Sequence, residues 1–307
     1  MTAPERRYDT PVALRAAITD RLRAITAKDR SRSLSDLIRQ FAYDRLLYRI
    51  FTRVDAQRWV LKGATALLAR LGGEARHSVD IDLYDQSGVL DEAESALNTA
   101  AALDVGDQFR FVLAPGRHMV EQGIALRVPV TAYLGVSEFA NFNVDLVVNT
   151  GMTGVPEQAD PLVAVNVPGV PQTKYRIYPL ADHVADKVFA IIERHPRVGG
   201  PAIVSSRYRD LADLVVIAHR ETLEAAALRR ALRAQSDRRR MGVPNELTVP
   251  DNGEWRAGYV RVARDVPGID EKDYDSAVAA ARRFIDPVLK GSADGHWVPD
   301  RQEWTRS

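Results

Sequence analysis

Two aspartates that alternate with apolar residues are the part of the sequence best suited to chemistry: Asp80 and Asp82. Side chains alternate across a β-strand, so both carboxylates are expected on one face while Ile81 and Leu83 point into an apolar layer. Two like charges on one face repel each other unless a cation lies between them. Hard oxygen ligands suit Mg²⁺, with Mn²⁺ as a substitute, so this strand predicts a metal site for phosphoryl transfer.

The segment before this strand, Leu61-Lys62-Gly63-Ala64-Thr65-Ala66-Leu67, predicts a phosphate-binding turn. Gly63 permits close approach of the backbone to a ligand. A helix that begins near Thr65 would direct free N–H groups and the positive end of its dipole at phosphate. We therefore expect Gly63 and Thr65 to bind the phosphates of a nucleotide.

The two features together form a recognisable signature, although an Asp-x-Asp alone is also typical of an exposed strand face. The sequences Lys62-Gly63-Ala64-Thr65-Ala66-Leu67 and Arg76-His77-Ser78-Val79-Asp80-Ile81-Asp82-Leu83 resemble the signature of polymerase-beta-like nucleotidyltransferases. The resemblance is specifically to the AbiEii/AbiGii-type toxins, whose mycobacterial branch is called MenT. The chain departs from the pattern at Ala64, where the family often has a second glycine or a serine, and 14 residues separate Thr65 from Asp80.

The resemblance implies a role for each polar residue of the motif. Asp80 and Asp82 would hold Mg²⁺. Lys62 would neutralise charge on a nucleoside triphosphate, and Ser78 would steady a phosphate or a metal-bound water. Family members place a third carboxylate on a neighbouring strand, so Asp145 is a candidate general base or metal ligand, with an ordinary strand aspartate as the alternative.

Two blocks in the second half of the chain extend the resemblance. In residues 178–188 the family's lysine contacts the triphosphate, and Lys187 suits that role because its flexible stem reaches phosphate oxygens. In residues 205–214 the family motif makes Asp210 the functional acid, which would orient Lys187 or contact the nucleotide. A first-turn residue favoured by the helix dipole is the alternative for Asp210. Asp213, one turn later, is expected to pair with an arginine.

A ladder of arginines lies on the helix expected from Ser33 or Ser35 to about Arg53. Arg45 and Arg49 continue the apolar stripe of this helix at four-residue spacing. We expect them to turn toward the catalytic cleft or toward RNA phosphates, with a solvated helix face as the alternative.

A second cluster of arginines lies near the start of the final third of the chain. Residues 225–264 contain nine arginines and four acidic residues. Such a local excess of positive charge fits contact with tRNA phosphates, above all by Arg238, Arg239 and Arg240. A solvated helix end is again the alternative.

A hydroxyl that can be phosphorylated precedes the aspartates at Ser78. If the strand extends that far, the hydroxyl lies on the same face as Asp80, beside the metal and the triphosphate. Phosphorylation would add about −1.5 to −2 charge at pH 7 and would exclude a polyanionic substrate. We therefore expect an antitoxin or a kinase to silence the protein at Ser78, unless this hydroxyl only bonds the preceding turn.

Composition limits the classes of protein that need to be considered. The 307 residues contain no cysteine, which excludes disulfides, thiolate catalysis and zinc–thiolate sites. The first seven residues lack an apolar segment and no run approaches a membrane span, so we expect a cytoplasmic protein without membrane contact. The net charge is only +1, so nucleic-acid binding requires clustered basic residues.

Periodicity and the resemblance together predict an α/β (α+β) protein with two lobes. Residues 1–165 would form N-terminal helices and a polymerase-beta-like nucleotidyltransferase lobe on a mixed sheet. Residues 166–307 would form a mainly helical C-terminal lobe, with substrates meeting in the cleft. Prolines and glycines in residues 151–171 are expected to connect the lobes and to include an edge strand around Leu162 to Val167.

The resemblance implies the toxin half of a type IV toxin–antitoxin pair, with a cognate antitoxin protein as partner. It further implies transfer of nucleotides, cytidylate from CTP by preference, to the 3′ acceptor end of tRNA, which blocks aminoacylation and translation. Two other classes remain open. One is a small-molecule nucleotidyltransferase of the antibiotic-modifying kind, in which the arginine cluster would have no function. The other is a non-catalytic nucleotide-binding partner protein, whose cellular effect would survive loss of Asp80.

Overall fold

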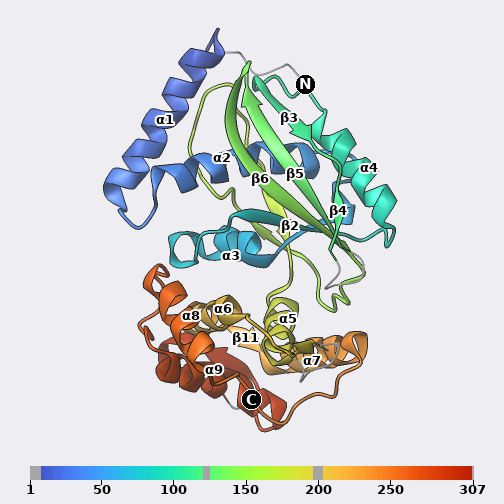
Figure 1. The fold of residues 1–307 in the computed structure, drawn as a ribbon, viewed down its shortest axis with the longest axis vertical. Coiled ribbons are helices and arrows are strands. Elements are labelled where there is room, and N and C mark those ends of the chain that lie inside the picture. Colours follow the sequence, from blue (N-terminus) through green and yellow to red (C-terminus); the bar gives the residue numbers. More distant parts are fainter. Residues whose placement is uncertain (1–7, 120–124, 196–202, 306–307) are drawn as a thin grey trace. The chain divides into compact units, whose positions relative to one another are not determined.

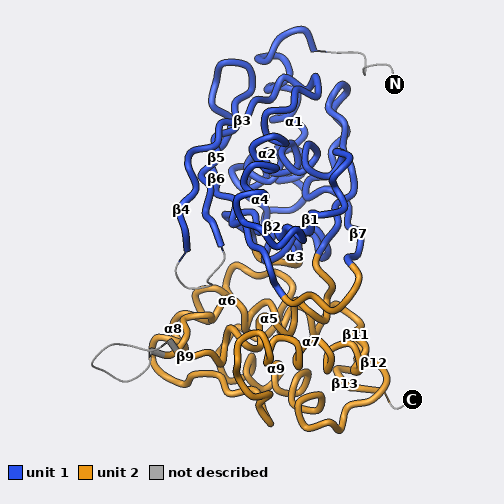
Figure 2. Tube along the Cα trace, turned by 90° about the vertical axis from the view of Figure 1, so that its right-hand side faces the viewer, with its two compact units in different colours: residues 1–72, 77–150, 156–177 blue, residues 73–76, 151–155, 178–307 orange. Residues whose placement is uncertain are grey.

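A computed structural model describes residues 8–119, 125–195 and 203–305 (Figure 1). Contacts within the chain divide it into two compact units (Figure 2). Unit 1 comprises residues 1–72, 77–150 and 156–177, and unit 2 comprises residues 73–76, 151–155 and 178–307. Compactness does not by itself show that a unit folds alone, so the domain boundary at residues 165/166 stays a prediction.

Unit 1 combines helices with one large sheet. Its helices are α1 (Pro11–Lys28), α2 (Leu34–Phe51), α3 (Gly63–Leu71) and α4 (Leu90–Ala101), with a 3₁₀ turn at Ala56–Arg58. Its strands are β1 (Trp59–Lys62), β2 (Asp80–Asp85), β3 (Phe109–Leu113), β4 (Arg117–His118), β5 (Ala125–Leu134), β6 (Ser137–Val148), β7 (Glu157–Ala159) and β8 (Tyr175–Ile177).

The sheet of unit 1 is mixed, as the sequence predicted. Its strand order is β3-β5-β6-β2-β1-β8-β7, with β4 paired to β5 (Figure 1). Strand β2 runs parallel to β6 and β1 runs parallel to β8, whereas the other pairs are antiparallel. Strands β5 and β6 form a long hairpin, whose turn contains Gly135 at φ +62°. The mixed α/β fold class is therefore confirmed.

One face of this sheet is covered by helices and the other carries polar side chains. Helices α2 and α4 pack against β6 on the covered face (Figure 1). Ile81 and Leu83 of β2 are fully buried, whereas Asp80 and Asp82, between them, are half-buried. The predicted alternation across this strand is thus present.

The arginine ladder of α2 lies inside unit 1. Arg45 and Arg49 have no exposed surface, and Arg49 makes a bidentate pair with Asp107, with Nη2–Oδ1 at 2.8 Å and Nη1–Oδ2 at 3.0 Å. Arg45 Nη1 lies 3.7 Å from the same carboxylate. Buried guanidinium groups offer no donor to RNA, so the predicted RNA contact of Arg45 and Arg49 is wrong. They fix the loop between α4 and β3 instead.

The segment predicted as an edge strand, Leu162 to Val167, is not a strand, although Val167 makes an isolated bridge to Val170. Its backbone is held by the buried Asp44 carboxylate, which accepts the N–H groups of Leu162 and Val163 at 2.9 Å each. Burial raises the pKa of Asp44 to about 6, against these hydrogen bonds, which lower it. The Asp44 side chain thus accepts the backbone hydrogen bonds that a neighbouring strand would accept in a sheet.

Unit 2 is mainly helical, as predicted. Its helices are α5 (Leu180–Ile192), α6 (Tyr208–Arg220), α7 (Ala225–Arg239), α8 (Gly253–Arg264) and α9 (Tyr274–Leu289), with a 3₁₀ turn at Pro299–Arg301. Its strands are short: β9 (Arg194–His195), β10 (Ile203–Val204), β11 (Leu223–Glu224), β12 (His296–Val298) and β13 (Glu303–Trp304).

The C-terminal segment packs on unit 2. Trp297 is buried and Trp304 is half-buried, and both rings contact Phe284 of α9, with centroid distances of 4.9 and 5.9 Å. Within the residues that the structure describes, no helix combines the length and the apolar character needed to cross a membrane.

The buried position of Arg49 makes a testable prediction. Replacing Arg49 with Met removes the bidentate partner of the buried Asp107 and leaves only Arg45, 3.7 Å away, which should lower the free energy of unfolding by about 3 kcal/mol. Arg53→Met is the matched control, because Arg53 pairs with Asp55 near the surface and should cost less than about 1 kcal/mol. Urea denaturation of both variants measures the difference, and equal losses would contradict the structural role of Arg49.

Candidate active site

Polar side chains gather on the open face of the unit 1 sheet, where β2 and β6 run side by side. Asp80 lies opposite Asn143 and Asp82 lies opposite Asp145 in the register of the two strands. Asn143 Nδ2 donates to Asp80 Oδ1 at 2.9 Å. The structure therefore brings the predicted carboxylates Asp80, Asp82 and Asp145 onto neighbouring positions of one face.

Gly63 is required by the position of Asp82. It is the first residue of α3 and has φ +59°, a conformation that L side chains rarely adopt. A β-carbon at residue 63 would overlap the carboxylate of Asp82. Lys62, which precedes Gly63, lies directly opposite Asp82 in the β1–β2 pairing. The glycine turn thus lets a carboxylate approach the beginning of a helix, where N–H groups are free of intrahelical partners.

Two hydroxyl groups fix the start of β2. Thr65 Oγ1 and Ser78 Oγ both donate to the backbone carbonyl of Asp80, at 2.6 and 2.7 Å. The Thr65 side chain is fully buried, so its hydroxyl supports the strand and does not face a nucleotide.

The strand also begins later than expected. Strand β2 starts at Asp80, so it does not extend to Ser78, and the condition under which Ser78 would share the strand face with Asp80 is not met. Ser78 is 5% exposed and bonds the local backbone, which is the alternative considered for its hydroxyl. Its roles in nucleotide binding and regulation stay predictions.

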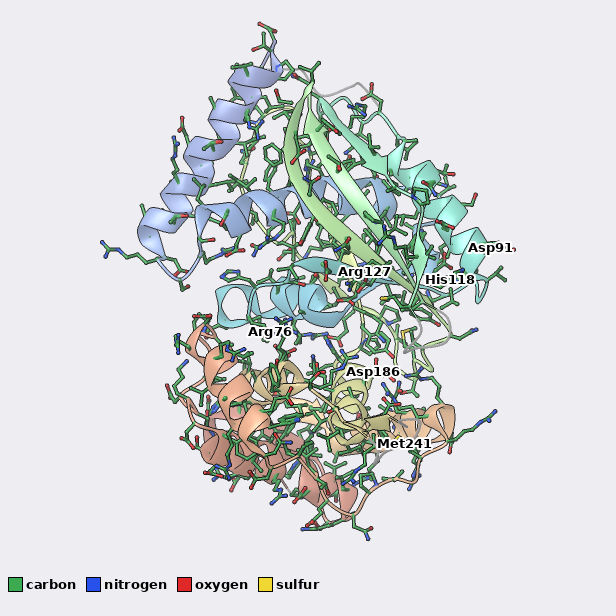
Figure 3. All side chains as sticks on the ribbon, in the orientation of Figure 1. Arg76, Asp91, His118, Arg127, Asp186 and Met241 are labelled. Carbon is green, nitrogen blue, oxygen red and sulfur yellow. The ribbon has the colours of Figure 1, made fainter. Side chains whose placement is uncertain are left out.

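An arginine that sequence analysis missed lies among the carboxylates. Arg127 lies on β5 (Figure 3). In the register of β5 and β6 it is paired with Asp145. Its Nε and Nη2 donate to Asp145 Oδ1 and Oδ2 at 2.7 and 2.6 Å, and Nη2 also lies 3.5 Å from Asp80 Oδ2. The signal available in the sequence was a charged residue at a half-exposed position of an otherwise alternating strand. A carboxylate engaged in this way is poorly placed to act as a general base.

The donor set of this face suits a hard divalent cation. Among the described residues no three Asp, Glu, His or Cys side chains are grouped closely enough to hold a metal ion by themselves. Mg²⁺, however, is usually bound by one or two carboxylates plus the phosphates of its substrate. Asp80 and Asp82 supply that number of carboxylates, so they fit Mg²⁺ or Mn²⁺ in a complex with a nucleotide.

The second set of predicted residues forms an ion-pair cluster in unit 2. Lys187 of α5 donates to Asp210 Oδ1 at 2.8 Å and to Asp213 Oδ2 at 2.6 Å. Arg76 makes a bidentate pair with Asp213, at 2.9 and 3.0 Å. The expected closeness of Lys187 and Asp210, and the expected arginine partner of Asp213, are both present, although Arg76 itself was not assigned this role.

Electrostatics keep this cluster charged. Burial lowers the pKa of Lys187, but Asp210 and Asp213 outweigh it, so that pKa lies above its usual value. Burial raises the pKa of Asp213, but Lys187 and Arg76 outweigh it, so that pKa lies below its usual value. Lys187 therefore remains a cation at neutral pH, held by two carboxylates.

The arginines predicted to bind RNA at the end of α7 differ from one another. Arg238 and Arg240 are exposed, and Arg240 ends the helix with φ +52°. Arg239 is half-buried and forms an ion pair with Glu193. Arg238 donates to Gln235 and lies 3.7 Å from Asp186. Two of the three guanidinium groups are thus open to a polyanion.

The close contact between Gly63 and Asp82 can be tested by comparison with Gly72, the residue that caps the C-terminal end of α3. Gly63 and Gly72 both have φ +59°, but a β-carbon at Gly72 would meet no atom within 4 Å. Alanine at either position should cost about 1–3 kcal/mol of unfolding free energy through backbone strain. Gly63→Ala should cost a further 1–3 kcal/mol or so, because Asp82 must move. Chemical denaturation compares the two, and equal losses would contradict the close contact.

Comparisons with known proteins identify the family of the chain. The family model described as "Nucleotidyl transferase AbiEii toxin, Type IV TA system" matches residues 45–281. No curated protein matches the sequence. Among solved structures, MenT4, a nucleotidyltransferase toxin from Mycobacterium tuberculosis H37Rv, is 19% identical with a TM-score of 0.50, over 91% of this chain and 98% of that one.

A further solved structure, JHP933 from Helicobacter pylori, is 15% identical with a TM-score of 0.43, over 88% of this chain and 95% of that one. The likeness to MenT4 concerns the fold alone, whereas the family model spans most of the sequence. The chain therefore belongs to the AbiEii family of nucleotidyltransferase toxins of type IV toxin–antitoxin systems.

Proposed function

We propose that this toxin transfers nucleotides, cytidylate from CTP by preference, to the 3′ acceptor end of tRNA. A tRNA extended in this way cannot be aminoacylated, so translation stops. The observation that carries the proposal is the pair Asp80 and Asp82 on one open sheet face beside the Gly63 turn, in a chain of this family.

The proposed reaction is an in-line displacement at the α-phosphorus of the nucleotide. The 3′ hydroxyl oxygen of the RNA forms a bond to phosphorus, the bond to the bridging oxygen breaks, pyrophosphate leaves, and the hydroxyl proton passes to solvent. Asp80 and Asp82 would hold Mg²⁺ or Mn²⁺, which when bound offsets charge on the attacking and leaving oxygens. Gly63 leaves room for the Asp82 carboxylate, which places the carboxylate pair beside the N-terminus of α3, an end of a helix that favours phosphate.

Positive charge for the triphosphate at this face of unit 1 would come from Lys62. Lys62 is half-buried at the beginning of α3, directly opposite Asp82. Lys187 would act with Asp210, which fixes its ammonium by the 2.8 Å hydrogen bond. Lys187 is only 4% exposed and Asp213 also accepts from its ammonium, so its proposed contact with a nucleotide comes from the family motif and not from an exposed charge.

We propose that the exposed arginines at the end of α7 bind tRNA phosphates. Arg238 and Arg240 offer open guanidinium groups, and Arg230 and Arg233 of the same helix are also exposed. Arg239 contributes less, because Glu193 offsets its charge. Contact with phosphates carries no sequence information, so this surface would bind tRNA without selecting the nucleotide.

The family implies a cognate antitoxin. We propose that one mode of silencing is phosphorylation of Ser78, because a phosphate beside Asp80 would repel a nucleoside triphosphate. The hydroxyl is buried and bonded to the Asp80 carbonyl, so a kinase would have to open this turn first.

The function is tested by incubating the protein with total tRNA and each labelled nucleoside triphosphate, with and without Mg²⁺. We expect label on tRNA only with Mg²⁺, most strongly from CTP. Asp80→Asn should reduce labelling to less than about a hundredth, given that a metal ligand contributes at least as much as the roughly 10²–10⁴-fold of acid–base catalysis.

The matched control is Asp91→Asn, which changes an exposed aspartate of α4 (Figure 3) and should label tRNA at the wild-type rate. Label on a small molecule and not on RNA would contradict the substrate assignment. Full activity of Asp80→Asn would contradict the role of the carboxylates.

A further inference from the structure

Five charged residues lie at one level across five neighbouring strands of the unit 1 sheet. In strand order they are Lys62 on β1, Asp82 on β2, Asp145 on β6, Arg127 on β5 and Arg117 on β4. Residues paired in this way have their β-carbons about 4.5–5.5 Å apart and interact directly. The row thus places two anions between cations, and Arg127 is the cation that reaches a carboxylate of the metal-binding pair.

Arg127 bridges two carboxylates with one nitrogen. Its Nη2 lies 2.6 Å from Asp145 Oδ2 and 3.5 Å from Asp80 Oδ2, while Nε completes a bidentate pair with Asp145 at 2.7 Å. The guanidinium fork matches a carboxylate in two hydrogen bonds, which fixes its orientation. Asp145 is 9% exposed, so it depends on this partner more than an open carboxylate would.

The surroundings of Arg127 direct it toward the carboxylates. Arg117 lies directly opposite on β4, and like charges at paired positions repel. The guanidinium group of an arginine stays protonated at any ordinary pH. Arg127 is therefore a permanent cation beside Asp80.

Both oxygens of Asp80 already face a donor. Oδ1 accepts from Asn143 at 2.9 Å, and Oδ2 faces Arg127. A divalent cation that binds Asp80 must share Oδ2 with the guanidinium or displace it, and two cations at this distance repel each other strongly.

We propose that Arg127, held by Asp145, is a built-in counter-ion of the catalytic carboxylates, which competes with the divalent metal for Asp80 until a nucleoside triphosphate arrives. The phosphates then supply the negative charge to which Arg127 turns, so metal and nucleotide bind together. Asp145 is accordingly the anchor of a positioning residue and not a metal ligand. This inference rests on the proposed metal-dependent function.

Direct measurement of Mn²⁺ binding tests the proposed counter-ion role of Arg127. The free Mn²⁺ signal in electron paramagnetic resonance gives the affinity of the full-length protein without nucleotide. Arg127→Gln should bind Mn²⁺ about tenfold or more tightly than the wild type, because a repelling charge is gone. Arg127→Lys keeps the charge and should stay within about threefold of the wild type. Arg110→Gln is the matched control, since Arg110 lies exposed on β3 over the Tyr133 ring and should change nothing.

A second pair of variants gives an answer even if Arg127→Gln folds poorly. Asp145→Asn frees Arg127 to pair with Asp80, so this variant should bind Mn²⁺ more weakly than the wild type. Adding Arg127→Gln to Asp145→Asn should restore about tenfold tighter binding if Asp145 is only an anchor. A double variant no tighter than Asp145→Asn would overturn the proposal, because it would make Asp145 a ligand in its own right.

A parallel titration with a non-hydrolysable analogue of CTP distinguishes a failure of the counter-ion proposal from a failure of the proposed metal dependence. The analogue should raise the Mn²⁺ affinity of the wild type by a larger factor than that of Arg127→Gln. If the wild type binds Mn²⁺ with the analogue but Arg127→Gln behaves identically, only the counter-ion proposal is overturned. If neither the wild type nor any variant binds Mn²⁺ under any condition, the metal dependence of the proposed function is overturned together with the counter-ion proposal.

Discussion

The carboxylate of Asp82 lies against the backbone of Gly63, and the arrangement of the open sheet face depends on this contact. A side chain at residue 63 would overlap the carboxylate, so strand β2 and the start of α3 are brought together by the absence of a β-carbon. Thr65 completes the junction, because its hydroxyl bonds the Asp80 carbonyl from the same helix. The result is a carboxylate pair and a helix N-terminus at one place, which is what transfer to or from a triphosphate requires.

Charges elsewhere in the chain are neutralised in pairs, and this decides which arginines are available for binding. Arg45 and Arg49 are committed to Asp107 in the interior of unit 1. Arg76 is committed to Asp213 within unit 2. With 42 basic and 41 acidic residues, the chain has a net charge of only +1. A polyanion must therefore bind at local clusters such as the exposed end of α7, and not through the net charge of the molecule.

Features that depend on local sequence were predictable. The strict alternation of Asp80, Ile81 and Asp82 follows from the period of a strand, and the structure has it. The closeness of Lys187 and Asp210 followed from the family motifs and is also present.

Features that depend on distant partners were not predictable from spacing. Arg127 meets Asp145 because of the β5–β6 register, which no local pattern specifies. Arg49 is buried because Asp107, 58 residues later, accepts hydrogen bonds from its two terminal nitrogens, Nη1 and Nη2. Ser78 lies before the strand, and its hydroxyl shares the Asp80 carbonyl with that of Thr65, 15 residues earlier than Asp80.

The central claim is that Asp80 and Asp82 hold the catalytic metal while Asp145 holds Arg127. Crystals grown with Mn²⁺ and a non-hydrolysable analogue of CTP would test it most directly through anomalous scattering. We predict a Mn²⁺ peak about 2.1 Å from oxygens of Asp80 and Asp82, with no Asp145 oxygen at the metal and with Arg127 turned from Asp80 toward a phosphate. A peak coordinated by Asp145, or a bound nucleotide with no metal at Asp80, would contradict it.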